Sequence, residues 1–187
     1  MKVVFLVGFM GAGKSRVGRS LAERLNWTFE DLDDRIERSQ GRKIAEIFQN
    51  AGESSFREAE HTALKQLLDE VRGGVSRVVA LGGGAFVQSN NAALLKAAKV
   101  PTVYLDAPVE ELWRRCSEQA GTAGAQRPLL QSKEQFRRLH DRRRKGYLKA
   151  SLKIATGGRD VEAVAADITK ALGLHAIAAR TELGETE

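Results

Sequence analysis

The segment GFMGAGKS, residues 8–15, constrains this chain more than any other part of it. It fits the pattern G-x-x-x-x-G-K-[ST], in which a glycine-rich loop turns its backbone amides towards phosphate oxygens at the start of a helix. The apolar run 2–7 predicts a buried strand before the loop, and Val17, Leu21 and Leu25 mark one face of a helix after it. The alternative, a glycine-rich turn with a chance Lys-Ser pair, leaves the flanking strand and helix unexplained. The sequence therefore predicts a nucleoside triphosphate site.

The residues of this loop have distinct expected roles. Lys14 would reach the β- and γ-phosphates of ATP, and the Ser15 hydroxyl would ligate Mg²⁺. The predicted ATP-binding residues here are Gly11, Ala12, Gly13, Lys14, Ser15 and Arg16.

Strand-like and helix-like segments alternate along the rest of the chain. Four further runs predict strands, at 28–29, 77–81, 101–105 and 152–156. The segments between them carry helical periodicity, interrupted by glycines such as Gly41 and Gly52. This order predicts an α/β fold of P-loop kinase type, with a three-layer, doubly wound, parallel five-stranded sheet.

The length of 187 residues favours one domain, which we expect to span residues 1–172. Residues 118–126 are small, polar and aperiodic, and predict a mobile loop. Residues 173–187 lose the helical pattern and predict a frayed tail.

Composition excludes several classes of protein. Apolar residues make up 42% and charged residues 29%, which argues against collagen-like and wholly disordered chains, and no apolar run is long enough for a membrane span. Cys116 is the only cysteine, so we expect a reducing, cytoplasmic location. The net charge of +6 suits anionic small molecules, and the basic run 142–145 lacks the interleaved aromatic residues of a nucleic-acid platform. We expect neither nucleic-acid nor membrane binding.

Carboxylates and glycines follow two of the predicted strands. Asp31 and Asp33 come after the second strand, and Gly82, Gly83 and Gly84 come after the third. In a parallel sheet both segments lie at the same edge as the phosphate loop. The aspartates are either helix caps or a pair in which one carboxylate supports Mg²⁺ and the other accepts a proton from an attacking hydroxyl. The glycines form either a plain turn or a backbone that a ligand can approach closely.

Three arginines stand out by position. Arg143 falls within an apolar helical stripe, where a charge needs a partner or a bound anion. Arg57 either pairs with Glu60 on its own helix or points to the same crevice. If both arginines reach the crevice, they suit a carboxylate, which guanidinium groups bind in a bidentate way. Arg127 follows the predicted mobile loop, from which it could close over the phosphates.

Taken together, these motifs resemble the shikimate kinase family of P-loop enzymes, which phosphorylate the 3-hydroxyl of shikimate with ATP in aromatic amino-acid synthesis. The resemblance covers roughly residues 2–172 and rests on the order and spacing of seven segments. They are GFMGAGKS (8–15), DLD (31–33), GRKIAEIF (41–48), FRE (56–58), ALGGGAF (80–86), RPLL (127–130) and Arg143 with Tyr147.

The resemblance implies roles for the residues that match. Lys14, Asp33 and Arg127 would be catalytic, and Ser15 and Asp31 would hold Mg²⁺. Shikimate would be bound by Asp33, Arg57, Gly82, Gly83, Gly84 and Arg143, with substrate-binding helices at about 33–61. Arg115 would contact adenine, and Arg127 would belong to a lid at about 117–132. Phe48 and Phe56 would pack on the substrate side, and the enzyme would be a monomer.

This sequence departs from the family pattern in places. Arg16 stands where the family commonly has Thr or Ser, and Lys145 and Gly146 precede Tyr147 where the family usually has a Pro. Two rival functions stay open at this point. One is another small-molecule P-loop kinase, such as a gluconate kinase, and the other is a nucleotide-binding protein without an acceptor.

Overall fold

The structure is a computed structural model that describes residues 2–123 and 132–176. Its centre is one parallel sheet in the order β2-β3-β1-β4-β5. The strands are β1 Val3–Val7, β2 Thr28–Asp31, β3 Arg77–Ala80, β4 Thr102–Asp106 and β5 Leu152–Ala155. Every residue of β1 is buried, as expected for a central parallel strand covered on both faces. The predicted five-stranded parallel sheet is confirmed.

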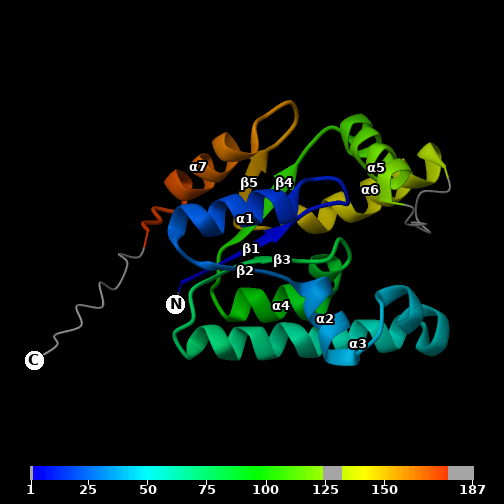
Figure 1. The fold of residues 1–187 in the computed structure, drawn as a ribbon, viewed down its shortest axis with the longest axis horizontal. Coiled ribbons are helices and arrows are strands. Elements are labelled where there is room, and N and C mark those ends of the chain that lie inside the picture. The colour runs from blue at the N-terminus through cyan, green and yellow to red at the C-terminus, as the bar shows by residue number, and fades with distance from the viewer. Residues whose placement is uncertain (1, 124–131, 177–187) are drawn as a thin grey trace, which may run out of the picture.

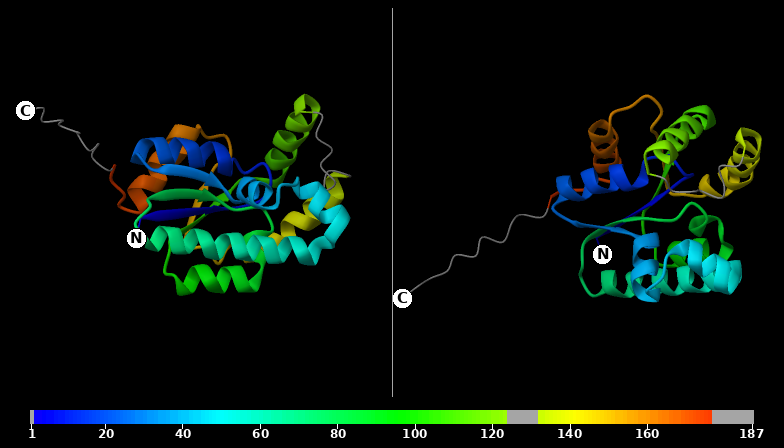
Figure 2. Two further views of the ribbon diagram at one scale, coloured as in Figure 1. Left: turned by 60° about the horizontal axis from the view of Figure 1, so that its bottom comes forward. Right: turned by 45° about the vertical axis from the view of Figure 1, so that its right-hand side comes forward.

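Helices cover both faces of the sheet and give the three predicted layers (Figure 1). Helices α1 and α7 lie on one face, and α3 and α4 lie on the other, as both turned views also show (Figure 2). The helices are α1 Lys14–Leu25, α2 Leu32–Gln40, α3 Ile44–Arg72, α4 Ser89–Ala97, α5 Val109–Ala123, α6 Lys133–Tyr147 and α7 Val161–Ala171, with a 3₁₀ turn η1 at Ala85–Val87. In the part of the chain described, no helix is both long and apolar enough to cross a membrane.

The strand register places three loops at one edge of the sheet. Ala80 of β3 pairs with Leu6 of β1 on one side and with Asp31 of β2 on the other. The phosphate loop, the start of α2 and the glycines after β3 therefore leave the sheet side by side. The predicted breaks are also present, because Gly41 ends α2 with φ 62° and Gly52 interrupts α3 with φ 77°.

The prediction of a loop over residues 118–126 is wrong for its first six residues. Residues 118–123 continue α5, which ends at Ala123. Residues 118–120, Glu-Gln-Ala, are good helix formers and extend the helix beyond its apolar repeat, and the helix continues through Gly121 and Thr122 despite their low propensity. Residues 124–131, which include Arg127 and half of the lid predicted at 117–132, lie outside the described residues, whereas residues 117–123 of that lid belong to α5. Leu174, in the predicted tail, packs against the core, and residues 177–187 are not described.

Candidate functional site

The loop between β1 and α1 has the geometry of a phosphate cradle. Gly11 and Gly13 adopt φ 79° and 90°, and a Cβ atom added at Gly11 would lie 2.8 Å from a backbone oxygen of α5. Gly13 is the N-cap of α1 and supplies no side-chain cap, so the first amides of the helix are available to an anion. Lys14 Nζ donates to the carbonyl oxygens of Gly8 at 2.9 Å and Phe9 at 3.1 Å. Burial lowers the pKa of Lys14, and the carboxylates of the site oppose that shift.

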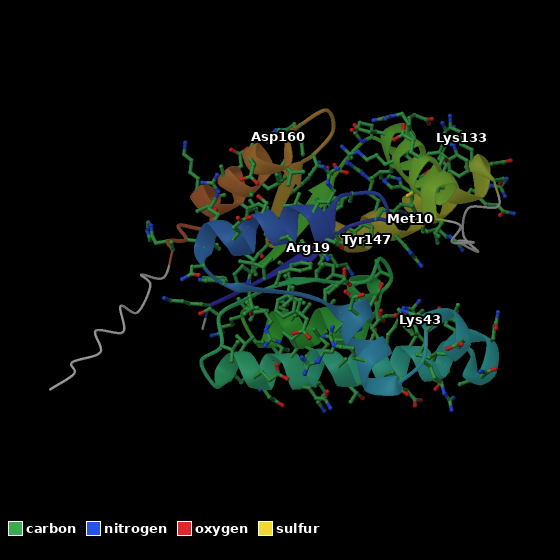
Figure 3. The ribbon with its side chains drawn as sticks, viewed as in Figure 1. Met10, Arg19, Lys43, Lys133, Tyr147 and Asp160 are labelled. Atoms are coloured by element: carbon green, nitrogen blue, oxygen red, sulfur yellow. The ribbon has the colours of Figure 1, made fainter. Side chains whose placement is uncertain are left out.

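One side of the loop opens into a cavity of ≈ 540 Å³. Its polar lining includes Lys14 and Ser15 of the loop. Beyond the loop, the lining is formed by Arg16, Asp31, Asp33, Arg57, Glu60, Gly82, Gly83, Gly84 and Arg143. Its apolar lining includes Met10, Ile44, Phe48, Phe56 and Leu81. Figure 3 shows Met10 of the loop and Tyr147 of α6 between the α5–α6 pair and the α2–α3 pair. The predicted acceptor residues and the phosphate loop thus share a single cavity.

Asp31 and Ser15 bring two hard oxygen donors together at the start of α1. The Ser15 hydroxyl donates to Asp31 Oδ2 at 2.8 Å. The other oxygen, Asp31 Oδ1, accepts from the backbone N–H of Asp33 at 3.1 Å and caps α2. Asp31 is therefore both a helix cap and a candidate metal ligand. The two roles that the sequence offered as alternatives, capping a helix and supporting Mg²⁺, do not exclude each other.

Asp33 carries the group best suited to accept a proton. Burial raises the pKa of its carboxyl group to about 6, and the charge of Asp31 adds to the rise while Lys14 opposes it. Its Oδ1 atom is buried and has no hydrogen-bond partner among the described residues. A buried carboxyl group with a raised pKa in the lining of a cavity is typical of a general base.

Arg57 is both paired and exposed to the cavity. Its guanidinium bonds to Glu60 Oε2 at 3.0 Å and to Glu53 Oε1 at 3.0 Å. Glu60 is only 1% exposed and lines the same cavity, and burial raises its pKa while Arg57 opposes the rise. The sequence indicated Glu60 only as a structural partner of Arg57. The sequence shows that Glu60 lies three residues after Arg57, which predicts an ion pair on one helix. That spacing does not show whether this face of the helix lines a ligand cavity.

Arg143 is held by aromatic groups rather than by a carboxylate. Its guanidinium carbon lies 5.9 Å from the centre of the Phe9 ring, within cation–π range. The Phe9 ring also packs edge to face against the ring of His140, with 5.4 Å between ring centres. His140 lies on α6, as Arg143 does. Among the ion pairs of the described residues, none joins Arg143 to a carboxylate. Its charge is therefore available to an anionic ligand.

A second cavity of ≈ 540 Å³ lies on the other side of the loop. Arg16 lines both cavities, and Arg114, Arg115, Glu118, Thr156 and Arg159 line the second. Arg115 donates to the carbonyl oxygens of Gly11 at 3.2 Å and Thr156 at 3.1 Å, and also pairs with Glu111. Arg115 therefore lies directly beside the phosphate loop and in the lining of the second cavity.

The glycines after β3 give a direct test of this geometry. A Cβ atom added at Gly82 would lie 2.5 Å from Asp33 Oδ1, whereas one added at Gly83 would lie no closer than 3.5 Å to any atom, the nearest being Arg143 Nη1. Gly82→Ala should therefore displace the Asp33 carboxylate and lower kcat about tenfold or more, since misplacing a reacting group by an ångström is costly. Steady-state kinetics should show a smaller decrease for Gly83→Ala. Equal kcat values for the two variants would contradict the placement of Asp33 against Gly82.

A phosphate loop facing carboxylates and guanidinium groups across one cavity defines the chain as a P-loop phosphotransferase. The family model for shikimate kinase matches residues 10–173, most of the chain. The chain belongs to the shikimate kinase family.

Individual relatives agree with this assignment. A shikimate kinase from Cereibacter sphaeroides is 39% identical over 189 aligned positions, which cover 100% of this chain and 87% of the relative. One from Geobacter sulfurreducens is 42% identical over 176 positions, covering 92% and 91% of the two chains. The structure of shikimate kinase from Acinetobacter baumannii in complex with shikimate is 36% identical, with a TM-score of 0.80 and coverage of 92% and 93%. The resemblance drawn from the sequence motifs is confirmed, as are the P-loop kinase fold and the class of enzyme.

Proposed function

We propose that the chain transfers the γ-phosphoryl group of ATP to the 3-hydroxyl of shikimate, giving shikimate 3-phosphate and ADP in aromatic amino-acid biosynthesis. The observation that carries this proposal is the single cavity in which Arg57, Arg143 and Asp33 face the phosphate loop. Two guanidinium groups suit a carboxylate, and a carboxyl group of raised pKa suits a hydroxyl. Shikimate carries both functional groups on one small ring.

On the nucleotide side, the amides from Gly11 to Ser15 and the Lys14 ammonium would bind the phosphates. The nucleoside would occupy the second cavity beside Arg115, with Arg16 at the junction of the two cavities. Arg127, which lies outside the described residues, would close over the phosphates as part of the proposed lid.

The donor set beside the loop fits Mg²⁺. Ser15 and Asp31 offer hard oxygens, and no cluster of three or more His, Cys, Asp or Glu side chains in the described ranges could hold a metal by itself. In kinases Mg²⁺ keeps several waters and takes few protein ligands besides the substrate phosphates, so the two oxygens of Ser15 and Asp31 suit it. When bound, the ion neutralises charge that develops on the phosphate oxygens during transfer.

On the acceptor side, Arg57 and Arg143 would bind the carboxylate of shikimate, and the backbone at Gly82–Gly84 would line the ring. Asp33 would orient the 3-hydroxyl and take its proton. The hydroxyl oxygen then bonds to the γ-phosphorus while the bond from that phosphorus to the β,γ-bridging oxygen breaks, and its electron pair leaves with ADP. Phe48 and Phe56 contribute apolar lining to the same cavity, where they would pack on the substrate side.

ADP release from Mg·ATP tests the proposal, measured with shikimate, quinate, gluconate or no acceptor. Stimulation by shikimate well above that by the other two is expected, because only shikimate engages both arginines and Asp33. Stimulation by gluconate would favour the rival sugar-acid kinase. ATP binding without stimulation by any acceptor would favour a non-catalytic nucleotide-binding protein.

Arg143→Lys should raise the KM for shikimate about tenfold or more, because an ammonium group cannot replace a bidentate guanidinium and a hydrogen bond to a charged group is worth roughly 1.5–3 kcal/mol. The KM for ATP should change little. Arg142→Lys is the matched control, since Arg142 precedes it in α6 but is exposed. An unchanged KM for shikimate in Arg143→Lys would remove Arg143 from the acceptor site.

A monomeric state, a cytoplasmic location and a single domain over residues 1–172 stay predictions. Light scattering of the purified protein and fractionation of cells would test the first two, and limited proteolysis would test the third.

A further inference from the structure

Tyr147 connects the end of α6 to the glycine segment of the acceptor cavity. Its hydroxyl donates a hydrogen bond to the carbonyl oxygen of Gly83. The side chain is fully buried, with 0% exposure, and its ring stacks on Tyr104 of β4 with 5.3 Å between ring centres. Tyr147 does not line the cavity, so any effect it has on a ligand acts through the groups that do.

The backbone that Tyr147 holds lies between the two guanidinium groups of the site. A Cβ atom added at Gly83 would lie 3.5 Å from Arg143 Nη1, and one added at Gly84 would lie 2.8 Å from Arg57 Nη1. The same position at Gly83 is 3.8 Å from the carbonyl oxygen of Gly8 and from Met10 N of the phosphate loop. A shift of Gly83 would therefore change the spacing between both arginines and the loop.

Arg143 and Tyr147 are four residues apart on α6 and so lie on one face of that helix. The hydroxyl of Tyr147 thus ties the helix that carries Arg143 to the backbone segment that Arg143 faces. Burial raises the pKa of Tyr147, while the charge of Arg143 and its side-chain hydrogen bond to the Tyr147 hydroxyl oppose the rise, so the hydroxyl keeps its proton and remains a donor at neutral pH.

We propose that Tyr147 is a positioning residue for the acceptor half of the site: its hydrogen bond to Gly83 sets the separation between Arg143 and the Gly82–Gly84 backbone at which shikimate is bound. This inference rests on the proposed function, in particular on Arg143 as a ligand of the substrate carboxylate. Tyr147 touches neither substrate, so its contribution should be to acceptor binding rather than to nucleotide binding.

The matched pair Tyr147→Phe and Tyr104→Phe tests the proposal. Each variant removes one hydroxyl from the same ring stack. The Tyr104 hydroxyl donates to Asp106 at 2.7 Å, whereas the Tyr147 hydroxyl bonds to Gly83 and to the Arg143 side chain. Loss of the donor to the Gly83 carbonyl should raise the KM for shikimate about five- to thirtyfold in Tyr147→Phe, with the KM for ATP changed less than about twofold. Tyr104→Phe should leave the KM for shikimate within about twofold, because its hydroxyl does not reach the cavity backbone.

A spectroscopic measurement keeps the proposal testable if Tyr147→Phe fails to fold. The chain contains two tyrosines, so 3-fluorotyrosine incorporated into Tyr104→Phe labels position 147 alone. Saturation with shikimate in the presence of Mg·ADP should shift the fluorine resonance of position 147. No shift at saturation, with binding verified by calorimetry, would overturn the proposal.

The kinetic outcomes separate this proposal from the proposed function. An unchanged KM in Tyr147→Phe, together with a raised KM in Arg143→Lys, would overturn the role of Tyr147 alone. Equal increases in Tyr147→Phe and Tyr104→Phe would also overturn it, because they indicate general loosening of the ring stack. An unchanged KM in Arg143→Lys would instead contradict the carboxylate assignment on which it rests.

Discussion

Replacing Lys14 by alanine should lower kcat about a thousandfold while the fold is retained, because a preorganised charge at the transferring phosphoryl group contributes roughly 10²–10³ in rate and Lys14 is the cation within the loop itself. The ammonium group is buried and fixed by the carbonyl oxygens of Gly8 and Phe9, so no neighbouring lysine can take its place. ADP release at saturating shikimate measures the loss. Circular dichroism and thermal unfolding check the fold.

Lys65→Ala is a suitable control for this variant, since Lys65 is exposed on α3. Its kcat should equal that of the unmodified protein. Retention of more than about a tenth of kcat in Lys14→Ala would show that the loop binds phosphate without the lysine and would contradict its catalytic role.

Asp33→Asn should lower kcat by about 10²–10⁴, the usual contribution of a general base. The amide keeps the size of the side chain but cannot accept the proton of the hydroxyl. Asp34→Asn is the matched control, because Asp34 is adjacent on α2 and exposed. A fall of less than about threefold in Asp33→Asn would limit Asp33 to binding.

The raised pKa of Asp33 also predicts two pH dependences that Asp33→Asn should remove. With a pKa of about 6, the carboxyl group is protonated at lower pH, so kcat/KM for shikimate should fall about tenfold per unit below that value. The folded state binds this proton more tightly than the unfolded chain does, so the free energy of unfolding should decrease as pH rises from about 4 to about 6. A shift from 3.8 to about 6 limits this decrease to about 3 kcal/mol.

At neutral pH the asparagine variant should therefore be more stable than the natural chain, by about 1–3 kcal/mol in chemical denaturation. Lower stability combined with lost activity would indicate that the ionised carboxylate supports the fold, against the desolvation argument.

Much of the site follows from the sequence because its parts come at strand ends. A parallel sheet brings the carboxyl ends of its strands to one edge, so the order of motifs along the chain is enough to place the loop at 8–15, the aspartates after β2 and the glycines after β3 together. The local patterns that mark β1 and β3, buried valine-rich runs followed by glycine, are strong, whereas β2 is a short and only partly buried strand. The helical stripe of α6 likewise showed that Arg143 faces inward.

The contacts between distant elements could not be predicted in this way. Periodicity places Arg143 and Tyr147 on one face of α6, but it does not show that this face meets Phe9 and Gly83. Glu60 was missed as a cavity residue because its spacing to Arg57 is equally typical of a surface ion pair. These features depend on how helices pack across the sheet edge, which a single sequence does not specify.

In the proposed reaction, one cavity binds the acceptor carboxylate through two arginines while Asp33 receives the hydroxyl proton. The most direct test compares ADP release with shikimate and with its methyl ester, at saturating Mg·ATP, in the natural chain and in Arg143→Lys. We predict that kcat/KM for the ester is at least about a hundredfold lower in the natural chain, and that Arg143→Lys discriminates much less between the two acceptors. An ester used as well as shikimate by the natural chain would contradict binding of the carboxylate by the two arginines.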